Sequence, residues 1–279
     1  MGGLVLALLA AVAFGTSDFL GGYATRRSSA LAALLVAQVA GLAVVVPLLL
    51  AQPAPVAGPS LAWGAFGGVV GCLALVAFFR ALADGMMSTA APVTAVVAAG
   101  IPVVAGVLLG ERPAVQAWLG VCAGLLAVGV IGASNGPGAD GARRVRALAL
   151  ALAAGAGFGL FFVALSRAPA GGGFWPLLGA RLGSLTMLVT LVVAGRREWR
   201  VSGDALRPAA VSGALDMTAN ALFLLAVRQA DLVLVAVLAS LYPAATVVLA
   251  YGVLRERLRA PQLAGVGLAL LAVGLISSS

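Results

Sequence analysis

The feature that most constrains this chain is a succession of long apolar segments separated by short loops. Ten such segments cover about residues 4–24, 30–51, 61–82, 86–109, 113–133, 147–166, 174–194, 208–227, 232–253 and 260–277. Each has about the 20 residues that an α-helix needs to cross the hydrocarbon core of a bilayer. Continuous apolar runs lack the alternating pattern of a membrane β-barrel. The sequence therefore predicts an all-α integral membrane protein with ten transmembrane helices.

The composition supports a membrane protein and excludes several kinds of chemistry. Hydrophobic residues make up 62% of the chain and charged residues only 9%, whereas about 25% of a soluble domain is charged. The chain has no histidine, and all 17 basic residues are arginine. Imidazole catalysis, histidine metal sites and Schiff-base lysines are therefore excluded. We expect no metal, no cofactor and no enzymatic activity, and we interpret Cys72 and Cys122, which lie in apolar runs, as packing residues.

The loops divide the chain into two halves of similar length. The longest loops cover residues 134–146 and 195–207, so no separate soluble domain fits between the predicted helices. The first of these loops lies near the middle of the chain and is rich in Gly, Pro, Asp and Arg. We therefore predict a first five-helix unit over residues 1–138 and a second over residues 139–279.

Sequence landmarks recur between the two halves at nearly one offset. Glu111-Arg112 recurs as Glu256-Arg257, and the Leu-Ala-Val-Gly of residues 126–129 recurs at residues 271–274. The Phe14-Gly15 pair of the first segment recurs as Phe158-Gly159 in the sixth. Because five is an odd number of helices, the second unit must enter the membrane upside down relative to the first. The sequence thus predicts two inverted five-helix repeats, an arrangement recurrent in secondary transporters.

Arginine placement predicts the orientation of the chain. Odd-numbered loops carry 13 arginines, namely Arg26, Arg27, Arg80, Arg143, Arg144, Arg146, Arg196, Arg197, Arg200, Arg207, Arg255, Arg257 and Arg259. Even-numbered loops carry three, Arg112, Arg167 and Arg228, and Arg181 lies inside a predicted span. Since cytoplasmic loops are enriched in arginine, we expect the odd loops in the cytoplasm and both termini outside. The membrane expected is the bacterial inner membrane, and the arginine surplus then needs no nucleic-acid partner.

These landmarks make the chain resemble a ten-helix transporter of the EamA type in the drug/metabolite transporter superfamily. The resemblance rests on Phe14-Gly15-Thr16-Ser17 in the first segment, and on Leu-Gly-Glu-Arg (109–112) and Leu-Arg-Glu-Arg (254–257). Many relatives carry basic residues after the second span, whereas residues 52–60 here have none. The resemblance implies export of amino acids, including aromatic ones, or of other metabolites, and it does not identify the substrate.

Three charged residues lie well inside predicted spans, and each demands a reason because an unpaired charge in hydrocarbon is costly. Asp18 is placed to bind a substrate ammonium or to carry a proton, or else to make a structural hydrogen bond. Arg181 and Asp216 lie near the centres of the seventh and eighth segments. They are candidates either for holding a zwitterionic substrate or for a permanent ion pair. Asn220 shares a helix face with Asp216, and Gln38 corresponds to Arg181 in the repeat.

Aromatic residues complete the candidate substrate site. They are Phe14, Phe78, Phe79, Phe158, Phe161 and Phe162 in the first, third and sixth segments, with Tyr242 in the ninth. The resemblance implies that those three segments line a central cavity, where aromatic walls suit an apolar or aromatic substrate. Ordinary packing and lipid contact are the alternative. Tyr242-Pro243, Pro92 and Pro102 are candidate flex points or static bends.

The sequence as a whole favours a secondary transporter that moves small organic metabolites by alternating access between its two halves. Amino acids are the leading substrate class, and protons, exchanging through Asp18 or Asp216, are the candidate coupling ion. No phosphate-binding loop is present, so this chain does not itself use ATP. An ion channel or cation pore is the alternative, although the sequence lacks the rings of acids and filter sequences expected of one. A metal-dependent intramembrane enzyme is disfavoured by scattered acids and absent histidine.

Overall fold

The computed structural model of the chain describes residues 2–83, 87–108, 114–126, 141–195, 200–240 and 242–275, with gaps inside the third and last ranges. Its long helices are α1 (Gly2–Thr25), α2 (Ala30–Ala51), α3 (Gly58–Ala83), α4 (Met87–Leu108), α6 (Gly141–Arg167), α7 (Trp175–Ala194) and α8 (Gly203–Val227). A 3₁₀ turn, η1 (Ala170–Gly172), precedes α7, and α9 (Leu232–Ala239) follows α8. Within the described ranges, six helices are long and apolar enough to span a membrane, and Val93–Leu108 is a shorter apolar helix.

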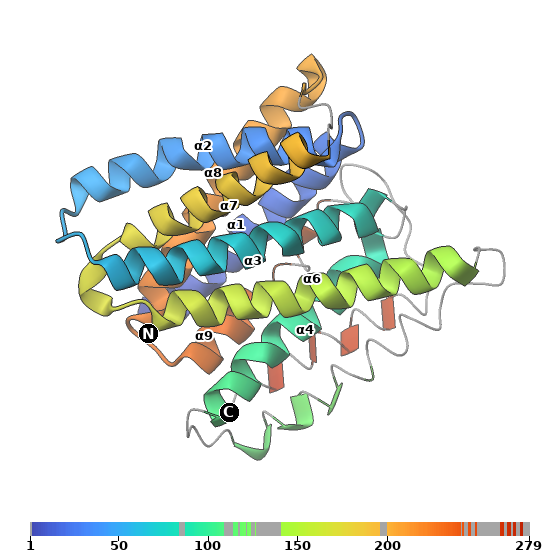
Figure 1. The fold of residues 1–279 in the computed structure, drawn as a ribbon. Helices are drawn as coiled ribbons and strands as arrows, with labels where there is room; N and C mark the ends of the chain where they lie inside the picture. The colour runs from blue at the N-terminus through green and yellow to red at the C-terminus, as the bar shows by residue number, and fades with distance from the viewer. Residues whose placement is uncertain are drawn as a thin grey trace.

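The helices form a closed ring. Proceeding from neighbour to neighbour, the packed order is α1, α8, α2, α7, α3, α6, α4, α9 and back to α1. Figure 1 shows one side of this ring, where α2, α7, α3, α6 and α4 lie side by side. The most extensive contacts join α1 with α8, α3 with α7 and α3 with α6. Each of these contacts joins a helix of residues 1–138 to a helix of residues 139–279, so the two predicted halves are interleaved.

Glycines allow the helices of the ring to approach closely. Gly64 and Gly68 of α3 face the backbone of α7, where a Cβ added at Gly68 would lie 2.7 Å from Ala180 Cα. A Cβ added at Gly213 of α8 would collide with the backbone of Ala37 in α2. Small residues at such positions let helix backbones pack together in the absence of a hydrophobic driving force from water. The small-residue pairs of α3 therefore serve packing within the chain.

Hydrogen bonds join α8 to α1 and, at its two ends, to neighbouring segments of the chain. The hydroxyl groups of Ser17 and Ser212 each donate to the other residue's backbone carbonyl, at 2.8 Å in both directions. Near the C-terminus of α1 and the N-terminus of α8, the Ser202 hydroxyl donates to the carbonyl of Arg27 at 3.0 Å. At the opposite end, the half-buried Arg228 donates from Nη2 to the carbonyl of Gly173 at 2.5 Å. Burial there lowers the pKa of the Arg228 guanidinium from its ordinary value.

Two helices begin earlier than their apolar runs predict. The eighth span was expected to start at Pro208, but α8 starts at Gly203, so Pro208 lies inside the helix. Proline there removes only one backbone hydrogen bond near the helix start, which is less disruptive than a central position. The sixth span was expected from residue 147, yet α6 starts at Gly141 and includes Arg143, Arg144 and Arg146 before that run. Arginine has high helix propensity, so a helix extends past the membrane-spanning run that hydropathy detects.

Several sequence predictions lie outside the described residues. These are most of the fifth and tenth segments, the Glu111-Arg112 and Glu256-Arg257 pairs, Pro243, and the side chain of Pro92. Pro102 lies within α4 and is buried. Cys72 is buried, Cys122 is exposed, and both are free thiols. The six membrane-length helices in the remaining ranges confirm an all-helical membrane protein in coarse terms.

Candidate functional site

The centre of the ring contains a cavity. It encloses about 690 Å³ of empty volume, including the part that is open to the surroundings. Its walls come from α1, α2, α3, α6, α7 and α8, with Tyr242 completing them. The lining residues are Phe14, Asp18, Gln38, Gly71, Leu75, Phe158, Phe161, Phe162, Leu177, Ala180, Arg181, Ser184, Asp216, Met217, Asn220 and Tyr242. The sequence analysis singled out ten of these sixteen residues, because polar and aromatic residues stand out in apolar helices.

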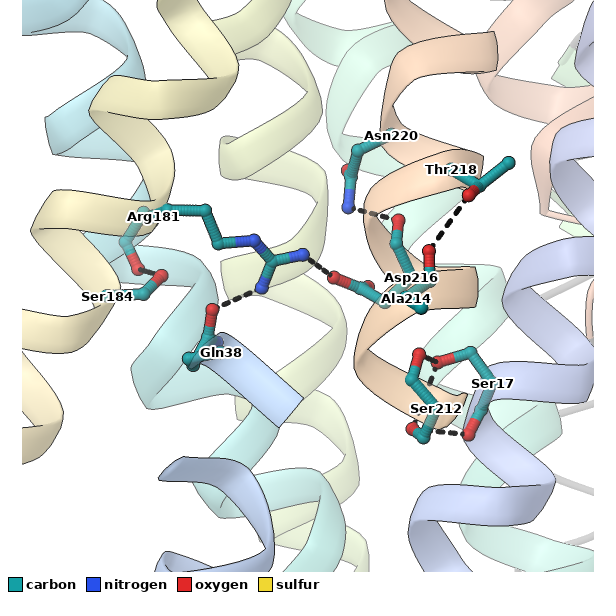
Figure 2. Close-up of polar contacts among 10 residues, drawn as sticks. Ser17, Gln38, Arg181, Ser184, Ser212, Ala214, Asp216, Thr218 and Asn220 are labelled. Atoms are coloured by element: carbon teal, nitrogen blue, oxygen red, sulfur yellow. Dashed lines mark hydrogen bonds and ion pairs between the residues drawn. The ribbon is translucent and has the colours of Figure 1, made fainter. Parts of the chain in front are cut away.

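Arg181 crosses the centre of the ring from α7. Its Nη1 donates to Oε1 of Gln38 on α2, and its Nη2 lies 2.5 Å from Oδ2 of Asp216 on α8 (Figure 2). The arginine side chain is 4% exposed and the aspartate side chain 25% exposed. A buried guanidinium is stable only with a counter-ion and additional hydrogen bonds, and both are supplied here. The structure thus brings together three of the predicted site residues from three helices.

The absence of a side chain at Gly41 leaves space for the Arg181 guanidinium to pack against α2. An added Cβ at this glycine would lie 2.6 Å from Arg181 Nε and 2.7 Å from Cζ, so the group lies directly against the α2 backbone. Nε is buried and makes no hydrogen bond. Gln38 and Gly41 are three residues apart on α2 and so share a helix face. One face of α2 therefore both supports the guanidinium and accepts a hydrogen bond from it.

A second, smaller cavity lies against the same polar layer. It shares Asp18, Gln38, Leu75, Arg181 and Asp216 with the larger cavity and adds Ser17, Gly21, Ala33, Leu34, Ala37, Phe79, Ala209 and Ser212. Along α1 the smaller cavity extends to Gly21, toward the loop that begins at Arg26, whereas the larger one extends to Phe14. The layer around Arg181 and Asp216 therefore stands between two cavities that extend toward opposite ends of the helices.

Asp18 contributes a carboxylate to both cavities. Within the part of the chain that the structure describes, no hydrogen bond or ion pair involves its side chain. The neighbouring Ser17 hydroxyl is already engaged with Ser212. The structural hydrogen bond considered from the sequence is therefore not formed among the described residues. Asp18 is a partly exposed acid that faces the interior of the ring without a cation beside it.

Two further polar residues of the larger cavity, Asn220 and Tyr242, each have an atom that makes no hydrogen bond to the described residues. Asn220 donates from Nδ2 to the carbonyl of Asp216 at 2.8 Å, one turn earlier on α8 (Figure 2). Its Oδ1 is buried without a hydrogen-bond partner among the described residues, and so is the hydroxyl of Tyr242. Buried polar atoms are nearly always satisfied, so such groups demand an explanation. Both residues line the cavity, where a bound ligand can supply the missing contacts.

The predicted phenylalanines separate into three groups. Phe14, Phe158, Phe161 and Phe162 line the larger cavity, and the Phe14 and Phe162 rings meet edge to face at 5.9 Å. Phe79 lines the smaller cavity. Phe78 lines neither cavity: it is fully buried in a cluster of apolar residues and contacts Phe158 edge to face at 5.9 Å. Phe78 therefore supports the wall from behind.

The sequence analysis did not select several lining residues. They are Gly71, Leu75, Leu177, Ala180, Ser184 and Met217. Apolar and small residues carry no signal in an apolar helix, so only a structure places them in a cavity. Ser184 lies three residues after Arg181 and could have been found on that spacing. Its hydroxyl donates to the carbonyl of Gly68 at 2.8 Å, and so it joins α7 to α3.

The described residues contain no group of three Asp, Glu, His or Cys side chains that could hold a metal ion. The chemistry of the cavity is therefore that of one ion pair, one carboxylate, a few polar groups and aromatic walls. Such a site can bind an organic molecule with a polar end and an apolar body.

Comparison with known proteins identifies the class to which this fold and cavity belong. The model of the EamA-like transporter family matches residues 1–133 and again residues 145–278. The chain therefore belongs to the EamA-like transporter family, and it is a multi-pass membrane transporter of small molecules. This membership does not favour the ion-channel alternative.

A solved structure titled only "Crystal structure of protein" is similar to this chain. It is 18% identical, covers 99% of this chain and 98% of its own, and superimposes with a TM-score of 0.70. At that identity the likeness shows the fold alone. A search of curated proteins finds no match.

Proposed function

We propose that this protein is a secondary transporter that exports small organic metabolites by alternating access, with amino acids as the leading substrate class. The observation that carries the proposal is the pair of cavities separated by the Arg181 layer. A carrier needs a central site that is reached from one side at a time. Two cavities that share one layer of lining residues fit that geometry.

The pairing of helices supports two inverted repeats. Exchanging α1 with α6, α2 with α7, α3 with α8 and α4 with α9 converts the order of the ring into itself. For example, the α1–α8 contact becomes the α6–α3 contact, and both are extensive. Gln38 and Arg181, which correspond in the repeat, meet at the centre. The two matches of the family model, at residues 1–133 and 145–278, agree with the same division.

The repeat suggests how the two states interconvert. In inverted-repeat transporters, one half rocks against the other around a fixed central site. Here the larger cavity and the smaller cavity exchange roles when the halves rock. Asp18 and Asp216 belong to both cavities and stay accessible to the substrate or to a proton in either state. We therefore propose these carboxylates as the sites of proton coupling.

Reconstitution tests the function directly. Purified protein in liposomes is assayed for uptake of a panel of labelled amino acids and other metabolites, with and without a pH gradient. We expect saturable uptake that the gradient accelerates, and we expect Asp18→Asn to abolish the acceleration. Asp204→Asn, an exposed acid in the first turn of α8, is the matched control. Absence of saturable flux for every compound contradicts the proposed function.

A further inference from the structure

The larger cavity has two carboxyl groups but only one arginine among its described lining residues. Its ionisable side chains are Asp18, Arg181, Asp216 and the neutral phenol of Tyr242. Arg181 and Asp216 form an ion pair at 2.5 Å and cancel. Asp18 is left without a cation in the part of the chain that the structure describes. If the larger cavity is the substrate site, as proposed above, it therefore offers a substrate one carboxyl group that is not paired with a cation among the described residues.

The guanidinium of Arg181 has no edge left for a substrate carboxylate. A carboxylate is recognised by two parallel N–H groups of an arginine. On the edge formed by Nη1 and Nη2, the two nitrogens already donate to Gln38 and Asp216. On the edge formed with Nε, that nitrogen is buried against Gly41. A substrate carboxylate would have to displace Asp216 and would leave that acid without its cation.

The buried polar atom of α8 that has no hydrogen bond among the described residues is Asn220 Oδ1, which is an acceptor. Asn220 uses its amide nitrogen on the Asp216 carbonyl, which leaves the buried Oδ1 free to accept a hydrogen bond. An ammonium has three N–H groups to donate and no acceptor. Asp18 on α1 and Asn220 on α8 both line the larger cavity, and α1 and α8 are in extensive contact. The cavity thus presents a carboxylate and an amide oxygen to a donor.

The rest of the wall suits the body of an aromatic or apolar amine. Phe14, Phe158, Phe161 and Phe162 line the same cavity. Aromatic rings bury apolar surface, and their faces attract a cation. Among the described residues, Arg181 is the only arginine that lines this cavity.

We infer that the preferred substrates are aromatic or apolar monoamines without a carboxylate, bound through the ammonium at Asp18 and Asn220. The corresponding amino acids bind more weakly, because their carboxylate loses its hydration and finds no unpaired cation among the described residues that line the cavity. This inference rests on the proposed transport function and replaces amino acids with amines as its leading substrate class. It makes Arg181 a positioning residue, because Arg181 holds the Asp216 carboxylate in an ion pair.

Three related compounds distinguish the effect of a ligand's carboxylate charge on binding from the effect of its size. Phenylethylamine carries only the ammonium, phenylalanine adds a carboxylate, and phenylalaninamide replaces that carboxylate with a neutral amide of similar size. Binding of each compound to the purified full chain in lipid nanodiscs is measured at pH 7 by equilibrium dialysis, with empty nanodiscs as the blank. We expect phenylethylamine and phenylalaninamide to bind at least about tenfold more tightly than phenylalanine, because each leaves no carboxylate to desolvate.

Variants assign the binding to the proposed groups. Asp18→Asn should reduce phenylethylamine binding by about tenfold or more, because it removes the carboxyl group proposed to bind the ammonium. Asn220→Leu, which keeps a similar side-chain volume, should weaken it by a smaller factor. Asp204→Asn is the control and should change nothing, since this acid is exposed at the start of α8. The melting temperature of each variant in detergent shows whether it is folded.

The possible results distinguish a failure of the monoamine inference from a failure of the proposed transport function. Binding of phenylalanine as tight as that of phenylethylamine overturns the inference, and so does weak binding of phenylalaninamide, which would point to size rather than charge. Binding that survives in folded Asp18→Asn protein overturns it as well. In each of these cases saturable flux of amino acids in liposomes would leave the proposed transport function standing.

Discussion

At the scale of single residues, Arg181 determines the character of the cavity. It is 4% exposed, and its contacts with Gln38 and Asp216 connect three helices at one level. The sequence left open whether this arginine holds a substrate or a structural counter-ion. In this conformation it holds the counter-ion, and the carboxylate without a cation is Asp18. Arg181 therefore shapes the site because it keeps the Asp216 carboxylate in an ion pair.

The ion pair predicts non-additive effects on stability. Arg181→Met and Asp216→Asn should each lower the melting temperature in detergent, because each leaves a charge without its partner. The double variant should be less destabilised than the sum of the two, with a coupling energy of about 1–3 kcal/mol. The lower end is expected because Asp216 is partly exposed. Strictly additive losses would show that the pair contributes nothing to folding.

At the scale of elements, close approach of α3 and α7 holds the wall of the cavity. The two helices meet where glycines of α3 face the α7 backbone. The Ser184 hydroxyl reinforces the contact through its hydrogen bond to the Gly68 carbonyl. Because Ala180 and Arg181 line the cavity from this part of α7, any separation of the helices moves the polar layer.

A methyl group placed between the two helices tests this packing. Gly68→Ala should destabilise the protein by about 1–3 kcal/mol, because its Cβ would meet the Ala180 backbone. Gly100→Ala in α4 is the matched control, since none of the residues that the structure describes lies within 4 Å of its added Cβ. The control should be neutral or stabilising by up to about 1 kcal/mol from helix propensity. Thermal unfolding in detergent measures both, and equal shifts would refute the packing argument.

At the scale of the whole molecule, the two cavities and the arginine distribution together predict access from opposite sides. The smaller cavity extends toward the end of α1, where Arg26 and Arg27 follow. Arginine-rich loops lie in the cytoplasm. The smaller cavity should therefore face the cytoplasm and the larger one the outside in this conformation.

Thiol labelling tests this orientation. In a background without Cys72 and Cys122, Asn220→Cys in the larger cavity should react with a membrane-impermeant maleimide added to intact cells. Ala33→Cys in the smaller cavity should react instead in inside-out vesicles. A transported substrate should change the two labelling rates in opposite directions as the halves rock. Labelling of both positions from the same side would exclude the proposed arrangement.

Much of the protein followed from the sequence because it depends on local properties. Long apolar runs dictate helices in a bilayer, since every backbone polar group must be satisfied within its own segment. The buried polar residues stood out for the same reason, and ten of the sixteen lining residues were singled out. Helix ends were less predictable, as α6 and α8 show, because a helix continues past the apolar run.

Only the tertiary structure decided which of the polar residues are partners. The sequence gives no distance between α2, α7 and α8, so it could not choose between a substrate-binding arginine and one paired with Asp216. Nor could it show that Phe78 lies behind the wall while Leu75 and Met217 belong to the cavity. Pairing depends on how helices distant in sequence are rotated and packed, and periodicity within one helix carries no information about that rotation.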